Sequence, residues 1–283
     1  MSGYLLEMTS GVVFSDIDGT LIDIFTGEFN TTIKFVNDLS KYGIPLVLCS
    51  SKTEAEQIEL RSMARISDPF IVENGGAVII PLGYFENISN FESRYNITRV
   101  GDYQIIELGK PASHIKSILQ NIRASSQFKF KSLSDLTIDE ISSITKMSSK
   151  AVSRMIQRKY GETIIEIERD DLPGFVTRVQ DFGLKVIFGG RFFDITGGND
   201  KGIGVKILVD LYRYKYGDDV VFFGIGDSKN DESMFRSVDF PMQVQRANGT
   251  WDDVNVDGLN KLNGIGPKGW ILGFNEIIHY LKK

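Results

Sequence analysis

The hydrophobic positions of the chain fall into short apolar runs that alternate with stretches of helical periodicity. Gly11–Phe14 is an apolar run too short for a helix, and a polar pair follows it. Similar runs come at Ile44–Cys49 and Pro69–Val72, and the second of these leads into Ala77–Ile80. Short apolar runs bounded by turn residues are typical of buried strands. The first 81 residues therefore predict three buried strands and a hairpin partner for the third.

Helical periodicity marks the segments between these runs. A predicted helix that Asn30 can cap and Gly43 ends carries three apolar residues on one face, namely Ile33, Val36 and Leu39. A second predicted helix starts from Ser/Thr caps near residue 51 and runs to about residue 65. Strands that alternate with helices imply right-handed crossovers and a parallel sheet covered on both faces. The predicted fold class is therefore α/β, with a Rossmann-like parallel sheet as its core.

The alternation stops between residues 82 and 193. Loops rich in Asn and Ser come first there, and helical and β-like pieces follow in runs, which is typical of α+β structure. The first pattern then resumes with a helix, a strand and two helices, predicted at Lys201–Tyr216, Val220–Ile225, Asn230–Val238 and from Pro267 onwards. We therefore expect a core of residues 1–81 and 194–283 and an inserted α+β cap domain of residues 82–193.

Composition narrows the classes of protein that fit this pattern. The 283 residues are 42% hydrophobic and 24% charged, an ordinary globular balance. The net charge of −5 argues against a chain built mainly to bind nucleic acid or an anionic membrane. The chain shows neither a secretory signal nor an apolar segment long enough to cross a bilayer, so we expect a cytoplasmic protein. The pattern predicts no particular oligomeric state.

Cysteine and histidine are too scarce to form common metal or disulfide sites. The chain has one cysteine and two histidines, which can form neither an internal disulfide nor an ordinary zinc site. Any catalysis must therefore depend on carboxylates, hydroxyls and lysine.

Polar residues follow the predicted strands at the points where the strands end, which is where ligands bind in open α/β sheets. These residues are Asp16, Asp18, Ser50, Asn74, Asp227 and Asp231. Carboxylates, together with water and phosphate oxygens, are the ligands that Mg2+ prefers. Ser50 can donate to a phosphate oxygen, and Lys201 can supply a positive charge beside it. The sequence therefore predicts a magnesium site for phosphoryl transfer.

Four segments in order resemble the motifs of the haloacid dehalogenase superfamily of phosphatases. They are Asp16-Ile17-Asp18-Gly19-Thr20, Ser50, Lys201 within Gly-Asn-Asp-Lys-Gly, and Gly226-Asp227-Ser228-Lys229-Asn230-Asp231. The resemblance implies that Asp16 is the nucleophile and Asp18 the general acid and base. It also implies that Ser50 and Lys201 bind phosphate.

The same resemblance implies a ligand set for Mg2+. The ion would be bound by a carboxylate oxygen of Asp16, the backbone carbonyl of Asp18 and the carboxylate of Asp227. Asp231 and Asn230 would orient these ligands.

Longer segments resemble one group within the superfamily, the phosphatases that act on mannosyl-3-phosphoglycerate. These segments are residues 48–53, 73–76, 197–202 and 266–270. The resemblance implies a small phosphorylated glycoside as the partner and mannosylglycerate, a compatible solute, as the product. Another sugar phosphate, such as glucosyl-3-phosphoglycerate, stays open, because mannose and glucose differ in configuration at only one hydroxyl.

The resemblance further implies that the inserted segment is a lid over the active site. Candidate contacts for a glycerate carboxylate or sugar hydroxyls are Lys52, Asn74, Arg178 and Arg191. Each arginine taken alone also fits an ordinary surface position.

Residues 134–159 carry the pattern of two short helices joined by a turn. A capping box opens the first helix at Thr137, and Ser148 or Ser149 can cap the second. The stretch 129–160 holds seven basic and three acidic residues, a local net charge of +4. The segment resembles a helix-turn-helix, which leaves a DNA-binding regulator as the alternative of a different class. A helical hairpin within a cap produces the same local pattern.

Overall fold

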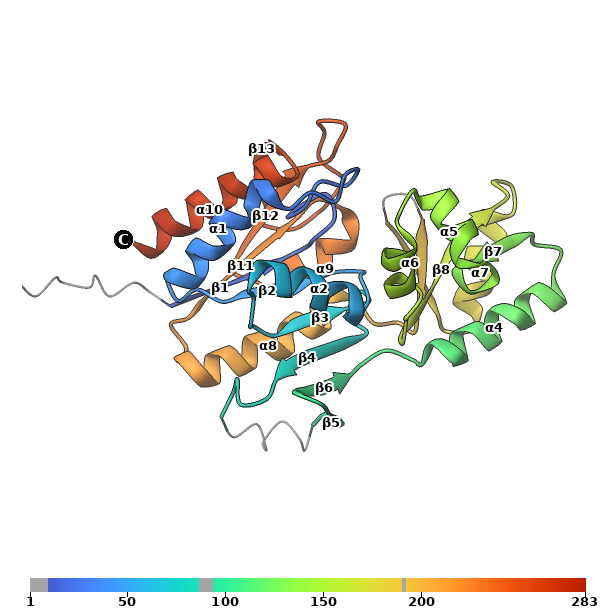
Figure 1. Cartoon of the computed structure of the whole chain (residues 1–283), viewed down its shortest axis with the longest axis horizontal. Coiled ribbons are helices and arrows are strands. Elements are labelled where there is room, and N and C mark those ends of the chain that lie inside the picture. The colour runs from blue at the N-terminus through green and yellow to red at the C-terminus, as the bar shows by residue number, and fades with distance from the viewer. Residues whose placement is uncertain (1–9, 87–93, 190–191) are drawn as a thin grey trace, which may run out of the picture.

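The computed structural model describes residues 10–86, 94–189 and 192–283. Figure 1 shows two parts side by side, a larger one that holds both the first strands and the C-terminal helix, and a smaller one formed by the middle of the chain. The sheet of the larger part has the strand order β13-β12-β11-β1-β2-β3-β4-β6-β5. In chain order its strands are β1 (Gly11–Ser15), β2 (Leu46–Cys49), β3 (Phe70–Val72), β4 (Ala77–Pro81), β5 (Ile97–Val100), β6 (Tyr103–Glu107), β11 (Val221–Gly226), β12 (Phe240–Gln245) and β13 (Asn260–Ile265).

Both faces of this sheet are covered by helices, as its apolar strands require. On β1, Val13 packs in the cluster with the first and last helices, whereas Val12 and Phe14 pack on the opposite side. The helices of the larger part are α1 (Asn30–Lys41), α2 (Glu54–Ala64), α8 (Lys201–Tyr216), α9 (Glu232–Phe235) and α10 (Pro267–Leu281), with a 3-10 turn η2 (Lys229–Asp231). The result is three layers, with the sheet in the middle.

The smaller part is built on an antiparallel sheet in the order β7-β8-β10-β9. Its elements are α4 (Ala112–Ser125), β7 (Phe130–Ser132), the 3-10 turn η1 (Leu133–Asp135), α5 (Ile138–Thr145), α6 (Ser149–Met155), β8 (Gly161–Ile167), α7 (Leu172–Asp181), β9 (Lys185–Phe188) and β10 (Phe193–Thr196). Ile164 of β8 packs with α4 and α7, and the next residue, Ile165, packs with α5 and α6. This alternation places helices on both faces of the sheet.

The predicted fold class is confirmed: a mainly parallel α/β sheet carries an inserted α+β part. The domain boundaries were expected at residues 81–82 and 193–194, but the chain crosses from the larger sheet to the smaller one, and back, at other positions. β5 and β6 extend the larger sheet through antiparallel pairing with β4, and β10 pairs with β8 and β9 in the smaller sheet. The crossings therefore lie near residues 108–111 and 197–199.

Two local expectations also differ from the structure. Asn30 is the first helical residue of α1 rather than its cap, and its side chain donates to Glu28. The helix expected at Asn230–Val238 is a 3-10 turn followed by the short helix α9, because the side chain of Asp231 accepts hydrogen bonds from the turn and holds it tight. None of the helices in the described part of the chain is long and apolar enough to cross a membrane.

Candidate active site

The order of four neighbouring strands brings the predicted site residues to one edge of the larger sheet. The strands β11, β1, β2 and β3 are adjacent and parallel, so their carboxyl ends meet at the same edge. Asp227 follows β11, Asp16 follows β1, Ser50 follows β2 and Asn74 lies just beyond β3. Lys201 reaches the same edge from the first turn of α8. Lys201 thereby becomes a neighbour of Asp16, which is 185 positions away in sequence.

The side chains of Lys201, Asp16 and Asp231 form a buried charged triad. The Lys201 ammonium donates to Oδ1 of Asp16 and to Oδ1 of Asp231, at 2.6 Å in each case. Burial raises the pKa of Asp16 to about 7, although the attraction of Lys201 lowers it. Burial disfavours the charged form of Lys201 as well, but Asp16 and Asp231 raise its pKa above the usual value. Lys201 is therefore a cation at neutral pH.

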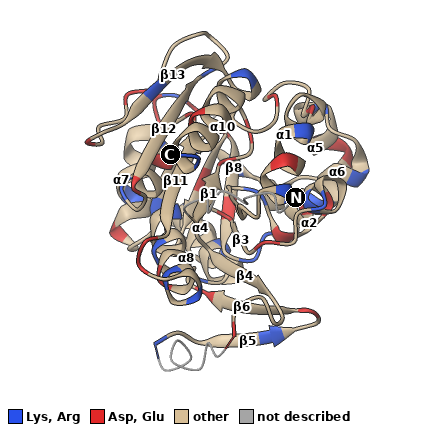
Figure 2. Ribbon diagram, turned by 90° about the vertical axis from the view of Figure 1, so that its left-hand side faces the viewer, with Lys and Arg blue, Asp and Glu red and all other residues tan. Residues whose placement is uncertain are grey.

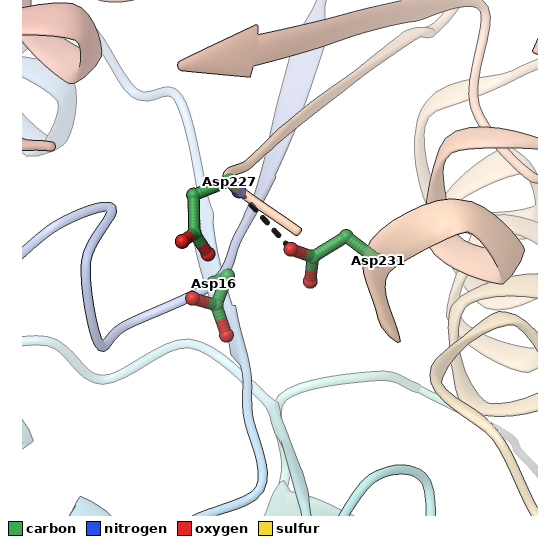
Figure 3. Close-up of side chains that lie close together, drawn as sticks. All are labelled: Asp16, Asp227 and Asp231. Atoms are coloured by element: carbon green, nitrogen blue, oxygen red, sulfur yellow. Dashed lines mark hydrogen bonds between the residues drawn. The ribbon is translucent and has the colours of Figure 1, made fainter. Parts of the chain in front are cut away.

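Asp227 completes a cluster of carboxylates with Asp16 and Asp231. Figure 3 shows the three side chains facing one another, and one oxygen from each lies within 4.8 Å of the others. Burial, followed by repulsion from Asp16, raises the pKa of Asp227 well above its usual value. The carboxylate of Asp227 has no hydrogen bond or ion pair with any residue that the structure describes. Such a buried acidic group calls for a cation.

The chemistry of this donor set fits a magnesium ion. Both oxygens of Asp231 are engaged, since Oδ1 accepts from Lys201 and Oδ2 accepts from the backbone N–H groups of Asp227 and Ser228 at 3.1 Å. Asp16 Oδ2 and the Asp227 carboxylate are the acceptors left over. Hard oxygen ligands of this kind suit Mg2+.

Close backbone packing holds this cluster in place. A Cβ on Gly226 would lie 2.5 Å from the Asp231 carboxyl, and one on Gly19 would lie 3.1 Å from Oδ2 of Asp227. Gly19 also has φ of +77°, in the region that favours glycine. The glycines of the two Asp-rich motifs thus let the backbone approach the carboxylates.

Asp18 lies at the mouth of the site rather than inside it. Its side chain is 38% exposed, and its Oδ2 is 3.0 Å from the ammonium of Lys52. Lys52 also lies 3.7 Å from Glu56, and the attraction of these acids raises its pKa despite the opposing effect of burial. The predicted general acid and the predicted substrate contact therefore already touch each other.

Ser50 is buried at the end of β2, where its hydroxyl accepts from the backbone N–H of Lys52 at 3.3 Å. Its carbonyl accepts from the backbone N–H of Asn74 at 3.0 Å, which ties the two strand ends together. The neighbouring thiol of Cys49 is fully buried, and burial raises its pKa. Cys49 is therefore protonated and takes no part in ionic chemistry.

The remaining predicted residues are distributed differently. The Asn74 side chain points to the smaller part, where its amide donates to Asp194 Oδ2 at 3.0 Å. Asn230 accepts from the Ser228 hydroxyl at 2.7 Å within the turn after β11. Arg178 is half-exposed on α7 and lies 3.6 Å from Asp181, without a contact to another predicted site residue. Arg191 lies outside the described residues.

The backbone of Asp16 is held by a hydrogen-bonded pair, Trp270 and Ser15, that could not be predicted from the sequence. The indole N–H of Trp270 donates to the Ser15 hydroxyl at 2.9 Å, and this hydroxyl donates to the carbonyl of Asp16 at 2.7 Å. Trp270 is fully buried, as its apolar spacing predicted, but its polar atom could not be placed from that spacing. A Trp on a helix face gives no local signal of its hydrogen-bond partner.

The helix-turn-helix-like segment is present, and its second helix faces the larger part. Helices α5 and α6 begin at their predicted caps, Thr137 and Ser148. The Thr53 hydroxyl at the start of α2 donates to the carbonyl of Arg154, which also pairs with Glu59. Figure 2 shows basic and acidic segments interspersed around α2 and α6. Five of the seven basic residues of this stretch form ion pairs with acidic residues.

Comparisons with known proteins agree with this geometry. The family model for haloacid dehalogenase-like hydrolases matches residues 13–252. The glucosyl-3-phosphoglycerate/mannosyl-3-phosphoglycerate phosphatase of Persephonella marina is 34% identical over 96% of this chain and 98% of its own length. The protein of the same name from Methanococcoides burtonii is 33% identical over 94% of this chain and 97% of its own length. The mannosyl-3-phosphoglycerate phosphatase of Pyrococcus furiosus is 37% identical over 82% of this chain and 90% of its own length.

Solved structures show the same fold. A protein of Thermoplasma acidophilum superposes with a TM-score of 0.64 at 16% identity, over 97% of this chain and 100% of its own. A haloacid dehalogenase superfamily phosphatase of Bacteroides thetaiotaomicron superposes with a TM-score of 0.61 at 16% identity, over 100% of both chains. The family model and the similar relatives confirm the predicted family and the predicted enzyme class, that of the phosphoric monoester hydrolases. The chain belongs to the haloacid dehalogenase-like hydrolases.

Proposed function

We propose that this protein is a magnesium-dependent phosphatase that converts mannosyl-3-phosphoglycerate into mannosylglycerate and phosphate. The observation that carries the proposal is the buried cluster of Asp16, Asp227 and Asp231 around Lys201, at the edge of the sheet where ligands bind. The substrate is supported by relatives at 33–37% identity, whose names include mannosyl-3-phosphoglycerate phosphatase activity.

In the proposed reaction, a carboxylate oxygen of Asp16 attacks phosphorus and the bond from phosphorus to the glycerate oxygen breaks. Asp18 gives its proton to the departing alkoxide, which its exposed position at the mouth of the site allows. The resulting aspartyl-phosphate is hydrolysed by a water molecule that gives a proton to Asp18, and inorganic phosphate leaves. Two easier displacements replace one difficult displacement.

Lys201 and Ser50 are the proposed phosphate ligands. Lys201 is a buried cation whose ammonium donates to Asp16 and Asp231, which leaves its third N–H for a phosphate oxygen in a site where charges are poorly screened. Ser50 is buried at the end of β2, next to the strand that leads to Asp16, and its hydroxyl hydrogen is donated to none of the described residues. Asp231 holds Lys201 in position through its 2.6 Å contact.

Asp16 and Asp227, with the backbone carbonyl of Asp18, are the proposed ligands of Mg2+. When bound, the ion supplies positive charge that offsets the repulsion between the anionic nucleophile and the anionic phosphate. Asn230 and Asp231 hold the turn that carries Asp227, since Asp231 accepts the backbone N–H of Asp227 and Asn230 accepts the Ser228 hydroxyl.

The smaller part is the proposed cap of this active site. It reaches the site through α6 and the loops that follow it, and Glu73 beyond β3 accepts the backbone N–H groups of Lys159 and Tyr160 at 2.9 Å. A cap closed in this way excludes bulk water while the phosphoryl group is transferred.

Phosphate release from mannosyl-3-phosphoglycerate tests the proposal directly. We expect turnover with Mg2+, loss of turnover with EDTA and recovery when Mg2+ is restored. Asp16→Asn should abolish turnover, whereas Asp38→Asn, a change of the same kind on the surface of α1, should not. Substantial turnover by Asp16→Asn would refute its assignment as the nucleophile.

Glucosyl-3-phosphoglycerate is the second candidate substrate, because two of the similar relatives are named for both compounds. The ratio of kcat/KM for the two glycosides decides between them. Retention of random duplex DNA on a filter at low salt, lost at moderate salt, would instead favour the helix-turn-helix hypothesis.

A further inference from the structure

Arg158, in the loop between α6 and β8, is a buried cation with unused hydrogen-bonding capacity. Its side chain is 8% exposed, and its Nε has no hydrogen-bond partner. Its ion-pair partner within the described part of the chain is Asp194, at 3.5 Å. A guanidinium has five N–H donors, and buried polar groups are seldom left without partners. The described surroundings of Arg158 therefore provide fewer acceptors than its guanidinium has donors.

The acids around Arg158 are already occupied by other donors. Asp194 Oδ1 accepts from the Thr163 hydroxyl at 2.6 Å, and its Oδ2 accepts from the amide of Asn74 at 3.0 Å. The two oxygens of Glu73 accept the backbone N–H groups of the residues that follow Arg158. These contacts fix the position of Arg158 without satisfying it. Burial lowers the pKa of Arg158, but attraction by Asp194 and Glu73 raises it above the usual value, so the group is charged.

Arg158 lies on the cap side of the proposed phosphate site. The loop of Glu73 and Asn74 is hydrogen-bonded to the loop after β2, since Glu73 N–H donates to the carbonyl of Lys52 and Asn74 N–H to that of Ser50. Figure 1 shows α6, which directly precedes Arg158, on the side of the cap that faces the larger part. Asn74 also has a buried side-chain carbonyl without a hydrogen-bond partner. Two buried polar atoms of neighbouring loops, Nε of Arg158 and Oδ1 of Asn74, therefore have no hydrogen-bond partner: the first needs an acceptor and the second a donor.

We propose that Arg158 binds a carboxylate on the substrate, on the far side of the reacting phosphate, and that it makes the enzyme selective for phosphate esters that carry one. This inference rests on the proposed function, in which the glycerate supplies that carboxylate. A planar guanidinium matches a carboxylate through two parallel N–H bonds. A neighbouring hydroxyl of the substrate would satisfy Asn74. Arg158 is then the specificity-determining residue of the cap.

Competition experiments test Arg158 with two matched small ligands. Inhibition of p-nitrophenyl phosphate hydrolysis is measured with 3-phosphoglycerate and with glycerol 3-phosphate, which has a hydroxymethyl group in place of the carboxylate. The wild type should bind 3-phosphoglycerate more tightly by roughly 10- to 100-fold, the range expected for hydrogen bonds to a charged group. Arg158→Gln should bring this ratio close to one. Arg158→Lys should leave an intermediate ratio, because it keeps the charge and loses the two parallel bonds.

A purely structural role for Arg158 predicts a different outcome. If Arg158 only joins the cap to the core, Arg158→Gln weakens both ligands equally and the ratio stays at its wild-type value, which overturns the inference. Arg123→Gln is the matched control, since Arg123 pairs with Asp135 at 2.6 Å elsewhere in the cap and its loss should leave the ratio unchanged. A wild-type ratio near one also overturns the inference.

The inference and the proposed function fail in distinguishable ways. Suppose that the wild type hydrolyses neither glycosylphosphoglycerate but prefers 3-phosphoglycerate over glycerol 3-phosphate, and that Arg158→Gln abolishes this preference. Carboxylate recognition by Arg158 then stands and the proposed substrate is wrong. If the wild type hydrolyses mannosyl-3-phosphoglycerate and Arg158→Gln keeps the wild-type kcat/KM for that substrate, the proposed function stands and the assignment of Arg158 is wrong.

Discussion

Asp16→Asn should make the metal-free protein more stable at neutral pH, although it removes the proposed nucleophile. Asp16 is buried beside Asp227 and Asp231, with Lys201 as the cation of the cluster. Burial favours the neutral form of the Asp16 carboxyl, and its pKa rises from 3.8 to about 7. Asparagine has nearly the same shape and is neutral at every pH. The variant therefore avoids the cost of holding this charge in the folded state.

The size of the effect follows from proton binding. Between pH 3.8 and about 7 the folded state holds a proton on Asp16 that the unfolded state has lost, so the free energy of unfolding falls as pH rises. The stabilising effect is complete below the lower pKa and is lost as pH passes the upper one. Integrated over this window, the loss relative to a neutral side chain is about 1 kcal/mol at pH 4.5 and about 4 kcal/mol at pH 8.

Urea unfolding in EDTA measures this difference. Wild type, Asp16→Asn and the surface control Asp38→Asn are compared at pH 4.5, 6 and 8. We expect the advantage of Asp16→Asn to grow with pH by about 3 kcal/mol, and that of the control to stay constant. An advantage that does not change with pH, or a variant less stable than wild type at pH 8, would refute the reasoning.

Magnesium should offset part of the stability that the wild type loses at high pH. An ion that binds the folded protein at 100 times its Kd stabilises it by about 2.7 kcal/mol. Since Asp16 is a proposed ligand, the same Mg2+ concentration should stabilise wild type more than Asp16→Asn at pH 8. Equal stabilisation of both would contradict the assignment of Asp16 as a ligand.

Three further substitutions test other parts of the site. Lys201→Met leaves its two carboxylate partners without their shared cation and should cost about 3–5 kcal/mol in urea unfolding at pH 8, less at pH 5, with loss of phosphate release. Gly75→Ala should cost more than about 2 kcal/mol, because its Cβ would lie 1.9 Å from the carbonyl oxygen of Asp200, whereas Gly83→Ala, also at positive φ but in open space, should cost about 1 kcal/mol. Trp270→Phe should cost about 1 kcal/mol in thermal unfolding through the lost hydrogen bond and should lower kcat more than it changes KM.

The parts of the fold that could be predicted from the sequence are those with a local signal. The apolar runs gave β1 to β4 and β11 nearly to the residue, and helical periodicity gave α8 from Lys201 to Tyr216. The strands β12 and β13 were missed, because Pro241 and the polar side chains of both strands break the apolar pattern. The extension of the larger sheet by β5 and β6 was also missed, since strand pairing depends on contacts that no local pattern records.

In the site, too, the residues with a local sequence signal could be predicted and the long-range contacts could not. The rule that ligands bind beyond strand ends placed Asp16, Ser50 and Asp227 at one edge from sequence alone. The ion pair between Asp18 and Lys52, and the burial of Arg158 beside Asp194, arise from segments that are far apart in sequence. Most lysines and arginines lie on the surface, so only the contacts in the folded chain reveal which of them is buried with an N–H donor left unpaired.

The charges of the site bear on what it can bind. Three buried carboxylates and one buried ammonium leave two excess negative charges when all are ionised, in a place where charges are poorly screened. A phosphate monoester dianion entering this site doubles the excess, so the protein alone repels the substrate on which it is proposed to act. A monovalent cation removes one charge, whereas a divalent cation removes the original excess and lets Lys201 attract the phosphate. The same imbalance that destabilises the metal-free fold therefore favours a divalent ion, and Asp227, which has no partner within the described residues, is where that ion is most needed.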